Sequence, residues 1–193
     1  MKKPPRSYGF QERLDFSNGH APHADSVLPF LADRIPNFKT VRRALKQNDK
    51  DGTDYYIERY GLKTLAVDLK LRDTDYSVQA PDFSDDLALE TFSVKEKDII
   101  GWTRDGAKTA DYILWYWKDT GRFFIVPFPP LCCVFQRCWE AWRERFGAWE
   151  QHTPGTRGWH SECVFVPRRL VMEAIWRWGS GHDTARIASE GKR

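Results

Sequence analysis

The sequence lacks the apolar run of about 18 residues that a membrane-spanning helix needs. Its N-terminal segment MKKPPRSYGF is basic but contains no apolar stretch of the kind that directs secretion. We therefore expect a cytoplasmic protein that does not bind membranes. Internal repeats are also missing. The content of 41% hydrophobic and 30% charged residues in a chain of 193 residues is typical of a globular protein with a sizeable core.

Several motifs of known chemistry are absent as well. The chain has no glycine-rich phosphate loop, no nucleophile elbow and no Ser-His-Asp order, which excludes the enzyme classes that these motifs define. The cysteines do not have zinc-site spacing, because Cys132 and Cys133 are adjacent and Cys138 follows alone. His160 and Cys163 form an isolated H-x-x-C. Buried, reduced thiols are the better interpretation for a cytoplasmic protein.

Charge is unevenly distributed along the chain. Residues 1–50 contain ten Lys and Arg against five Asp and Glu, whereas residues 51–100 contain six against twelve. The last 43 residues contain seven against four. An acidic centre between basic ends is typical of a metal site beside phosphate-binding surfaces, although ordinary charge scatter with basic termini gives the same pattern.

Two strand-like runs, GTDYYIERYG at 52–61 and LKTLAVDLKLR at 62–72, contain the most informative residues. Strand periodicity places Asp68 and Lys70 on one face of the second run. A three-residue connection with its glycine in the left-handed conformation would place Asp54 opposite Asp68. Facing carboxylates repel each other, and a divalent cation reverses that interaction. The runs therefore predict a metal site beside a lysine. The alternative is a solvated hairpin face.

With these residues the chain resembles the PD-(D/E)XK nuclease superfamily. Asp54 corresponds to the first acidic position of the signature, Asp68 to its (D/E) and Lys70 to its lysine. Thr53 stands where the family usually has proline. The resemblance covers about residues 8–130 and includes the predicted order helix, strand, strand with D-x-K, further strand, helix, strand.

The resemblance implies an α/β fold with a central mixed β-sheet flanked by helices, a restriction-endonuclease-like core at 8–130. A Trp-rich helical extension at 131–180, with the order helix, strand, helix, is expected to pack on the same domain. All nine tryptophans lie after residue 100. Other predicted elements are helices at 8–16, 24–35, 105–110 and 131–147, and strands at 86–93, 111–117, 121–127 and 163–167.

The activity implied by the resemblance is divalent-metal-dependent hydrolysis of phosphodiester bonds in nucleic acid, with DNA the expected substrate. The resemblance implies that Asp54, Asp68 and the Leu69 carbonyl hold Mg²⁺ or Mn²⁺. Lys70 would orient the attacking water or stabilise developing negative charge. Further catalytic candidates are Glu12 on the first predicted helix and Glu90 on the strand after the D-x-K. A purely structural role is equally open for both.

Surface cations beside the site are expected to hold the phosphate backbone without reading sequence. These candidates are Arg42, Arg43, Lys46, Arg72, Arg104 and Lys108. Trp102 and Trp159 are candidates for base stacking, and His160 for a phosphate contact, although core packing is the commoner use of tryptophan. The chain has no evident base-reading helix, so cleavage directed by DNA structure or DNA ends is expected. The partner, besides nucleic acid, would be a second copy of the chain or another protein.

A second hypothesis belongs to a different class of function. The chain would then be a catalytically inactive nuclease-like fold that binds nucleic acid or protein through its Trp-rich C-terminal half. Retention of the two carboxylates and the lysine at Asp54, Asp68 and Lys70 favours the enzyme.

Overall fold

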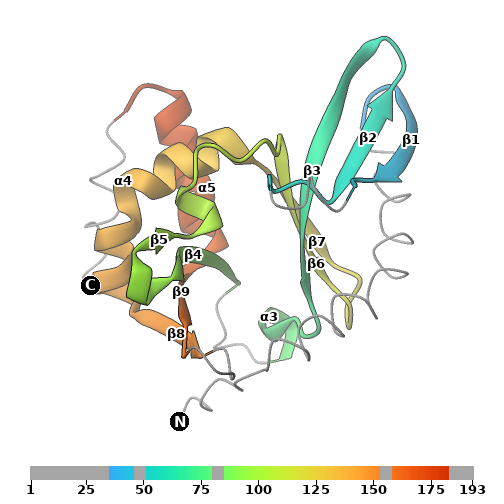
Figure 1. The fold of residues 1–193 in the computed structure, drawn as a ribbon. Coiled ribbons are helices and arrows are strands. Elements are labelled where there is room, and N and C mark those ends of the chain that lie inside the picture. The colour runs from blue at the N-terminus through green and yellow to red at the C-terminus, as the bar shows by residue number, and fades with distance from the viewer. Residues whose placement is uncertain (1–34, 46–50, 80–84, 153–157, 183–193) are drawn as a thin grey trace. The chain divides into compact units, whose positions relative to one another are not determined.

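The computed structural model describes residues 35–45, 51–79, 85–152 and 158–182. They belong to two compact units, each built around its own β-sheet (Figure 1). The five-stranded unit takes its described residues from 17–81 and 107–129, and the four-stranded unit from 82–106 and 130–193. This division differs from the expected core at 8–130 followed by an extension.

The five-stranded unit contains a mixed sheet with the order β1-β2-β3-β6-β7. The pairs β1–β2, β2–β3 and β6–β7 are antiparallel, and β3 and β6 are parallel. The strands are β1 (Phe38–Arg43), β2 (Tyr55–Arg59), β3 (Leu62–Arg72), β6 (Tyr112–Trp117) and β7 (Phe123–Pro127), and a short helix α3 (Tyr76–Gln79) follows β3. The prediction of an α/β fold with a mixed sheet is confirmed.

The β2–β3 hairpin turns at Gly61, whose φ of 66° lies in the left-handed region that glycine adopts at little cost. The strand register shifts between Ile57 and Arg59, and beyond the shift Tyr55 faces Val67. This register brings Asp54, the residue before β2, level with Asp68. The predicted left-handed glycine and the predicted pairing of the two strands are therefore confirmed. The connection is two residues long and not three, because Arg59 pairs with Leu62 and the extra residue lies within β3.

One face of this sheet forms a hydrophobic core. Tyr55, Ile57, Val67 and Leu114 are buried there. Leu65 and Leu69 pack against them from the same strand as Val67, so the predicted apolar stripe of β3 is confirmed. The alternation of side chains along β3 leaves Asp68 and Lys70 on the opposite face.

The end of β3 is fastened to the β6–β7 turn by a buried carboxylate. Asp75 is 1% exposed and accepts hydrogen bonds from the Arg122 guanidinium, one of 2.9 Å from Nη2, and from the Ser77 hydroxyl at 2.7 Å. Although burial opposes ionisation, the Arg122 and Ser77 hydrogen bonds lower the pKa of Asp75. This ion pair fixes the C-terminal end of the strand that carries Asp68 and Lys70.

The four-stranded unit contains an antiparallel sheet with the order β5-β4-β9-β8. Its elements are β4 (Asp86–Val94), η2 (Lys95–Lys97), β5 (Ile99–Ile100), η3 (Trp102–Arg104), α4 (Phe128–Phe146), β8 (Ala148–His152), β9 (His160–Pro167) and α5 (Arg168–Gly179). Helix α4 begins directly after β7, within the five-stranded unit, and continues into this one. Phe135 and Trp142 of α4 are fully buried, with ring centroids 6.0 Å apart.

Several predicted elements need correction. Residues 105–110 form no helix, because the helical turn there is η3 and ends at Arg104. Strand β4 exists but belongs to the other sheet, where it pairs with β5 and β9, and the neighbours of β3 are β2 and β6. The strands β1, β5 and β8 were not predicted. The helix at 8–16, and that at 24–35 except Ile35, lie outside the described residues. No helix in the described ranges is long and apolar enough to cross a membrane.

Candidate functional site

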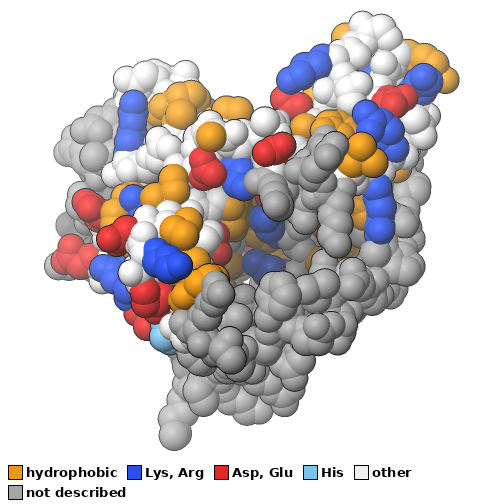
Figure 2. Space-filling view, in the orientation of Figure 1, with side chains coloured by type: hydrophobic (Ala, Val, Ile, Leu, Met, Phe, Trp, Pro, Cys, Tyr) orange, Lys and Arg blue, Asp and Glu red, His pale blue; other side chains and the backbone are white. Residues whose placement is uncertain are grey.

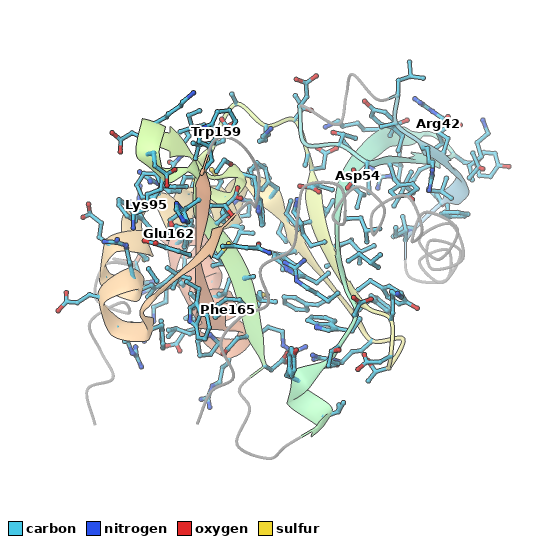
Figure 3. The ribbon with its side chains drawn as sticks, turned by 60° about the horizontal axis from the view of Figure 1, so that its bottom comes forward. Arg42, Asp54, Lys95, Trp159, Glu162 and Phe165 are labelled. Carbon is cyan, nitrogen blue, oxygen red and sulfur yellow. The ribbon has the colours of Figure 1, made fainter. Side chains whose placement is uncertain are left out.

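Two carboxylates meet where β2 begins beside β3. The Asp54 N–H donates to the Val67 carbonyl at 3.0 Å, and its Oδ2 accepts a hydrogen bond of 2.7 Å from the Leu69 N–H. Asp68 is only 6% exposed, and its carboxyl group is hydrogen-bonded to that of Asp54. Figure 3 shows Asp54 within the five-stranded unit. The structure thus brings together the two acidic residues that the sequence predicted to face each other.

Burial and charge repulsion change the titration of this pair. Burial raises the pKa of Asp54, and the neighbouring charge of Asp68 raises it further, to about 7. The Leu69 N–H and the positive charge of Lys70 act in the opposite direction without cancelling these effects. The pair therefore tends to hold one proton near neutral pH, as two close carboxylates do when no cation lies between them.

Lys70 lies beside the pair on the same face of β3. Its Nζ is 2.7 Å from Asp68 Oδ2, and its side chain is 21% exposed. The lysine thus places a positive charge next to the buried carboxylates and remains accessible to solvent. The three residues of the predicted signature are consequently neighbours in space.

A turn before β2 orients Asp54. Gly52 has φ +80°, a conformation that other residues rarely adopt, so the turn favours glycine, and a Cβ there would also meet the flexible Lys108 side chain, 2.9 Å away at Cδ. Thr53 is 1% exposed, and its hydroxyl lies 3.3 Å from the hydroxyl of Thr109. The Thr109 N–H also donates to the Asp51 carbonyl at 2.9 Å. The segment before β6 therefore braces the turn that carries Asp54.

The donor atoms at this site fit a hard divalent cation. In a strand the N–H and C=O of one residue point to the same side, so the Leu69 carbonyl faces the Asp54 side of β3. Within the described ranges no group of three or more His, Cys, Asp or Glu side chains could hold a metal ion. Two carboxylates and one carbonyl would supply few of the ligands of such a cation and would leave the other coordination positions to water. Mg²⁺ fits such a site because it usually keeps several waters in its coordination shell.

Two of the predicted phosphate-binding cations lie on segments next to these carboxylates. Lys108 contacts the Gly52 turn, two residues before Asp54. Arg72 ends β3, two residues beyond Lys70, and shares its face.

Two further predicted cations lie on the edge strand β1 of the same sheet. Arg42 stacks over the Tyr56 ring at 4.4 Å and pairs with Glu58 at 3.1 Å. Arg43 lies 5.9 Å over the Tyr55 ring. Figure 3 shows Arg42 and Asp54 within this sheet region. Lys46 lies outside the described residues.

The remaining predicted site residues lie in the four-stranded unit or outside the described residues. Glu90 and Arg104 belong to the four-stranded unit. The Glu90 carboxylate accepts hydrogen bonds from the Trp102 N–H at 2.9 Å and the Ser93 hydroxyl at 2.8 Å, so it caps the η3 turn. The Arg104 guanidinium lies 4.0 Å over the Trp139 ring and donates to the Thr91 carbonyl. Glu12 lies outside the described residues.

The residues considered for stacking and phosphate contact have protein partners. The His160 backbone N–H donates to the Glu96 carboxylate, and the His160 ring also contacts it. These hydrogen bonds hold the pKa of Glu96 down at about 2. Lys97 lies 4.5 Å over the Trp159 ring. In the structure His160 therefore contacts a carboxylate of its own unit, and its phosphate contact stays a prediction.

Sequence reasoning missed Thr109 as part of the site. It lies 55 residues after Asp54 in the numbering, and an isolated threonine before a strand carries no local signal. Only the parallel pairing of β3 with β6 brings it to the Asp54 turn. No protein-family model, curated protein or solved structure matches this chain.

Proposed function

We propose that this chain is a divalent-metal-dependent nuclease of the PD-(D/E)XK type that hydrolyses phosphodiester bonds, with DNA as the expected substrate. The single observation that supports this function best is the contact between Asp54 and Asp68, with Lys70 Nζ 2.7 Å from Asp68. A restriction-endonuclease-like core with a Trp-rich helical C-terminal part belongs to the same proposal.

In this proposal Asp54, Asp68 and the Leu69 carbonyl hold Mg²⁺ or Mn²⁺. When bound, the cation supplies positive charge that offsets the phosphate charge and makes water a better nucleophile. The two carboxylates lose their shared proton as they take up the cation, since acidic ligands must be deprotonated. Their burial keeps competing water away and strengthens the attraction between opposite charges.

Lys70 is the proposed partner of the reacting phosphate. Its ammonium group donates a hydrogen bond to the attacking water or to a phosphate oxygen whose negative charge grows. The water oxygen bonds to phosphorus and the P–O3′ bond breaks. One water proton ends on the leaving 3′ oxygen and the other is released, which gives a 3′ hydroxyl and a 5′ phosphate.

The proposal is tested by incubating the purified full chain with single-stranded, duplex and branched DNA and with RNA, in Mg²⁺, in Mn²⁺ and in EDTA. We expect cleavage only with a divalent cation, and no cleavage by Asp68→Asn, which preserves the shape of the side chain. Asp73→Asn, a nearby exposed carboxylate paired with Lys118, is the control and should cleave normally. Equal inactivity of wild type and Asp68→Asn with retained DNA binding would favour the non-catalytic binding module instead.

A further prediction concerns the Thr53–Thr109 contact, which braces the Asp54 turn. Thr109→Val removes the hydroxyl but keeps the shape of the side chain. It is expected to weaken Mn²⁺ binding about tenfold, the lower end of the range for residues that orient metal ligands. The lower end applies because Thr109 is exposed and water can partly replace its hydroxyl. Titration calorimetry with Mn²⁺ measures the change.

Thr109→Ser is the matched control because it restores the hydroxyl. It should bind Mn²⁺ as the wild type does, while both variants keep the melting temperature of the wild type in EDTA. Equal Mn²⁺ affinity of Thr109→Val and Thr109→Ser would show that the hydroxyl contact does not orient Asp54.

A further inference from the structure

The β2–β3 hairpin extends past the ends of β6 and β7, while β1 stays paired with β2 as far as Arg59. Strand β3 begins at Leu62, but it pairs with β6 only from Val67 onward. The first five residues of β3 therefore extend past the start of β6, and Figure 1 shows this projection at the upper right. This part of the molecule points away from the carboxylates along the axis of β3.

The tip of the hairpin exposes two large apolar side chains. Tyr60 is 64% exposed and Leu62 is 47% exposed. A Cβ placed on Gly61, between them, would meet no atom within 4 Å. Below the tip, the Arg59 guanidinium donates two hydrogen bonds to the Lys63 carbonyl, at 2.9 and 2.6 Å, and so holds the two strands together. The apolar tip is thus open on its outside and braced from within.

Basic side chains lie along this hairpin. Lys63 is 74% exposed and pairs with Asp111 at 2.7 Å, and Lys39 and Arg42 share one carboxylate partner, Glu58. With Arg59 these residues provide four cations against two carboxylates, and Figure 2 shows basic side chains at its upper right. A polyanion is the partner whose charge complements such a surface. Exposed aromatic rings beside cations are typical of surfaces that contact nucleic-acid bases.

The energies of stacking decide which form of nucleic acid fits. Stacking of a base on an aromatic side chain contributes about 1–3 kcal/mol. Opening a continuous duplex for an apolar wedge costs about a few kcal/mol for each base step. The stacking free energy that Tyr60 and Leu62 could contribute is only about as large as this opening cost. At a branch or an open end the face of a base pair is already exposed, so a side chain can stack on it without the cost of opening the duplex.

The register of β3 sets the distance between the tip and the carboxylates. Leu62 and Asp68 are six residues apart on β3. At about 3.3 Å per residue this separation is roughly 20 Å. Stacked nucleotides rise about 3.4 Å each along one strand, so the same distance covers about six nucleotides.

We infer that the β2–β3 hairpin tip stacks on the exposed base pair at a DNA junction, where a duplex opens into single strands. The inference rests on the proposed function for its second part, which is that the carboxylate site cleaves about six nucleotides from the junction. The hairpin thus selects junctions over continuous duplex and measures the position of the cut.

The test compares the tip variant Tyr60→Ala/Leu62→Ser with the matched control Tyr76→Ala/Val78→Ser. Tyr76 and Val78 are 58% and 62% exposed and lie on α3, at the other end of β3. Fluorescence anisotropy in Ca²⁺ measures binding to a forked duplex and to a duplex whose two ends are closed by loops. Cleavage of the forked duplex in Mn²⁺ is mapped on a sequencing gel.

The wild type and the control are expected to bind the forked duplex about tenfold more tightly than the closed duplex, as one stacked base would provide. The tip variant should lose this preference, and its cuts should no longer keep a fixed distance from the fork. A tip variant that prefers forks as strongly as the wild type overturns the inference, even if Mn²⁺-dependent cleavage persists. Failure of the wild type to cleave overturns the proposed function, whereas the anisotropy result still decides the role of the tip.

Discussion

Asp54→Asn is expected to stabilise the cation-free protein at about pH 8 by roughly 2 to 4 kcal/mol. The wild-type carboxylate is buried beside Asp68, and the two effects together raise its pKa to about 7. Ionising it in the folded protein therefore costs free energy that asparagine does not incur. The asparagine side-chain oxygen can still accept the hydrogen bond from the Leu69 N–H, so the turn before β2 keeps its anchor.

The same cause gives the wild type a characteristic pH dependence. The folded protein keeps a proton on Asp54 up to about pH 7, whereas the unfolded chain releases it near 3.8. The folded state therefore binds more protons between these values, and stability must fall as pH rises through that window. In Asp54→Asn this fall should be absent or much smaller. Urea unfolding at several pH values between about 5 and 8 measures both slopes.

Divalent cations should reverse the order of the two proteins. Mn²⁺ binds the folded wild type and stabilises it in proportion to the logarithm of the cation concentration, whereas Asp54→Asn lacks one of the two carboxylates. We expect Mn²⁺ to raise the melting temperature of the wild type and to leave that of Asp54→Asn unchanged. Asp73→Asn, which alters an exposed carboxylate, should behave like the wild type in both conditions. A destabilised Asp54→Asn would contradict the cost of ionising Asp54, and a variant that Mn²⁺ still stabilises would contradict the cation site.

The part of the candidate site that the sequence predicted correctly is encoded locally. Gly61 needs the left-handed conformation that other residues avoid, and the alternation of Leu65, Val67 and Leu69 defines which face of β3 is buried. Together they determine the strand register, and the register brings Asp54 to Asp68. Each step involves residues fewer than twenty positions apart, so strand periodicity and turn chemistry are sufficient.

The part that could not be predicted depends on contacts between distant segments. Strand β4 has the apolar alternation of an ordinary strand, and nothing in residues 86–94 shows that it pairs with β9 instead of β3. Glu90 was therefore a candidate for the carboxylate pair, with a structural role equally open, and in the structure its carboxylate caps η3. Thr109 joins the Asp54 turn only because β6 lies parallel to β3. Sequence periodicity shows which face of a strand is buried, but not which strand lies beside it.

The second large effect is expected from Glu162→Gln, because this glutamate is the buried centre of a charge cluster. Glu162 lies on β9 and its side chain is 0% exposed. Arg143 from α4 pairs with it at 2.8 Å, Lys95 from η2 at 2.9 Å, and the Thr91 hydroxyl on β4 donates to it at 2.8 Å. Figure 3 shows Lys95 and Glu162 in the four-stranded unit. One carboxylate therefore links three separate segments to β9.

The expected loss is roughly 3 kcal/mol of unfolding free energy. Burial alone would raise the pKa of Glu162, but the hydrogen bonds from Arg143, Lys95 and Thr91 outweigh burial and hold it at about 2. A glutamine in this place would turn its amide N–H groups toward donors and leave Arg143 and Lys95 without the negative charge between them. In the wild type the stabilisation is fully present above about pH 4.5 and is lost as pH falls through about 2.

Glu173→Gln is the matched control for this prediction. Glu173 lies on α5, is 41% exposed at its side chain, and pairs with Arg177 at 2.8 Å within one helix. An exposed pair of this kind contributes about 0.5 kcal/mol or less. Urea unfolding near neutral pH should therefore show a loss of unfolding free energy in Glu162→Gln that is several times the loss in Glu173→Gln. A Glu162→Gln protein as stable as Glu173→Gln would show that the three donors are satisfied by water as well as by Glu162. The carboxylate would then not be what holds η2, β4 and α4 to β9.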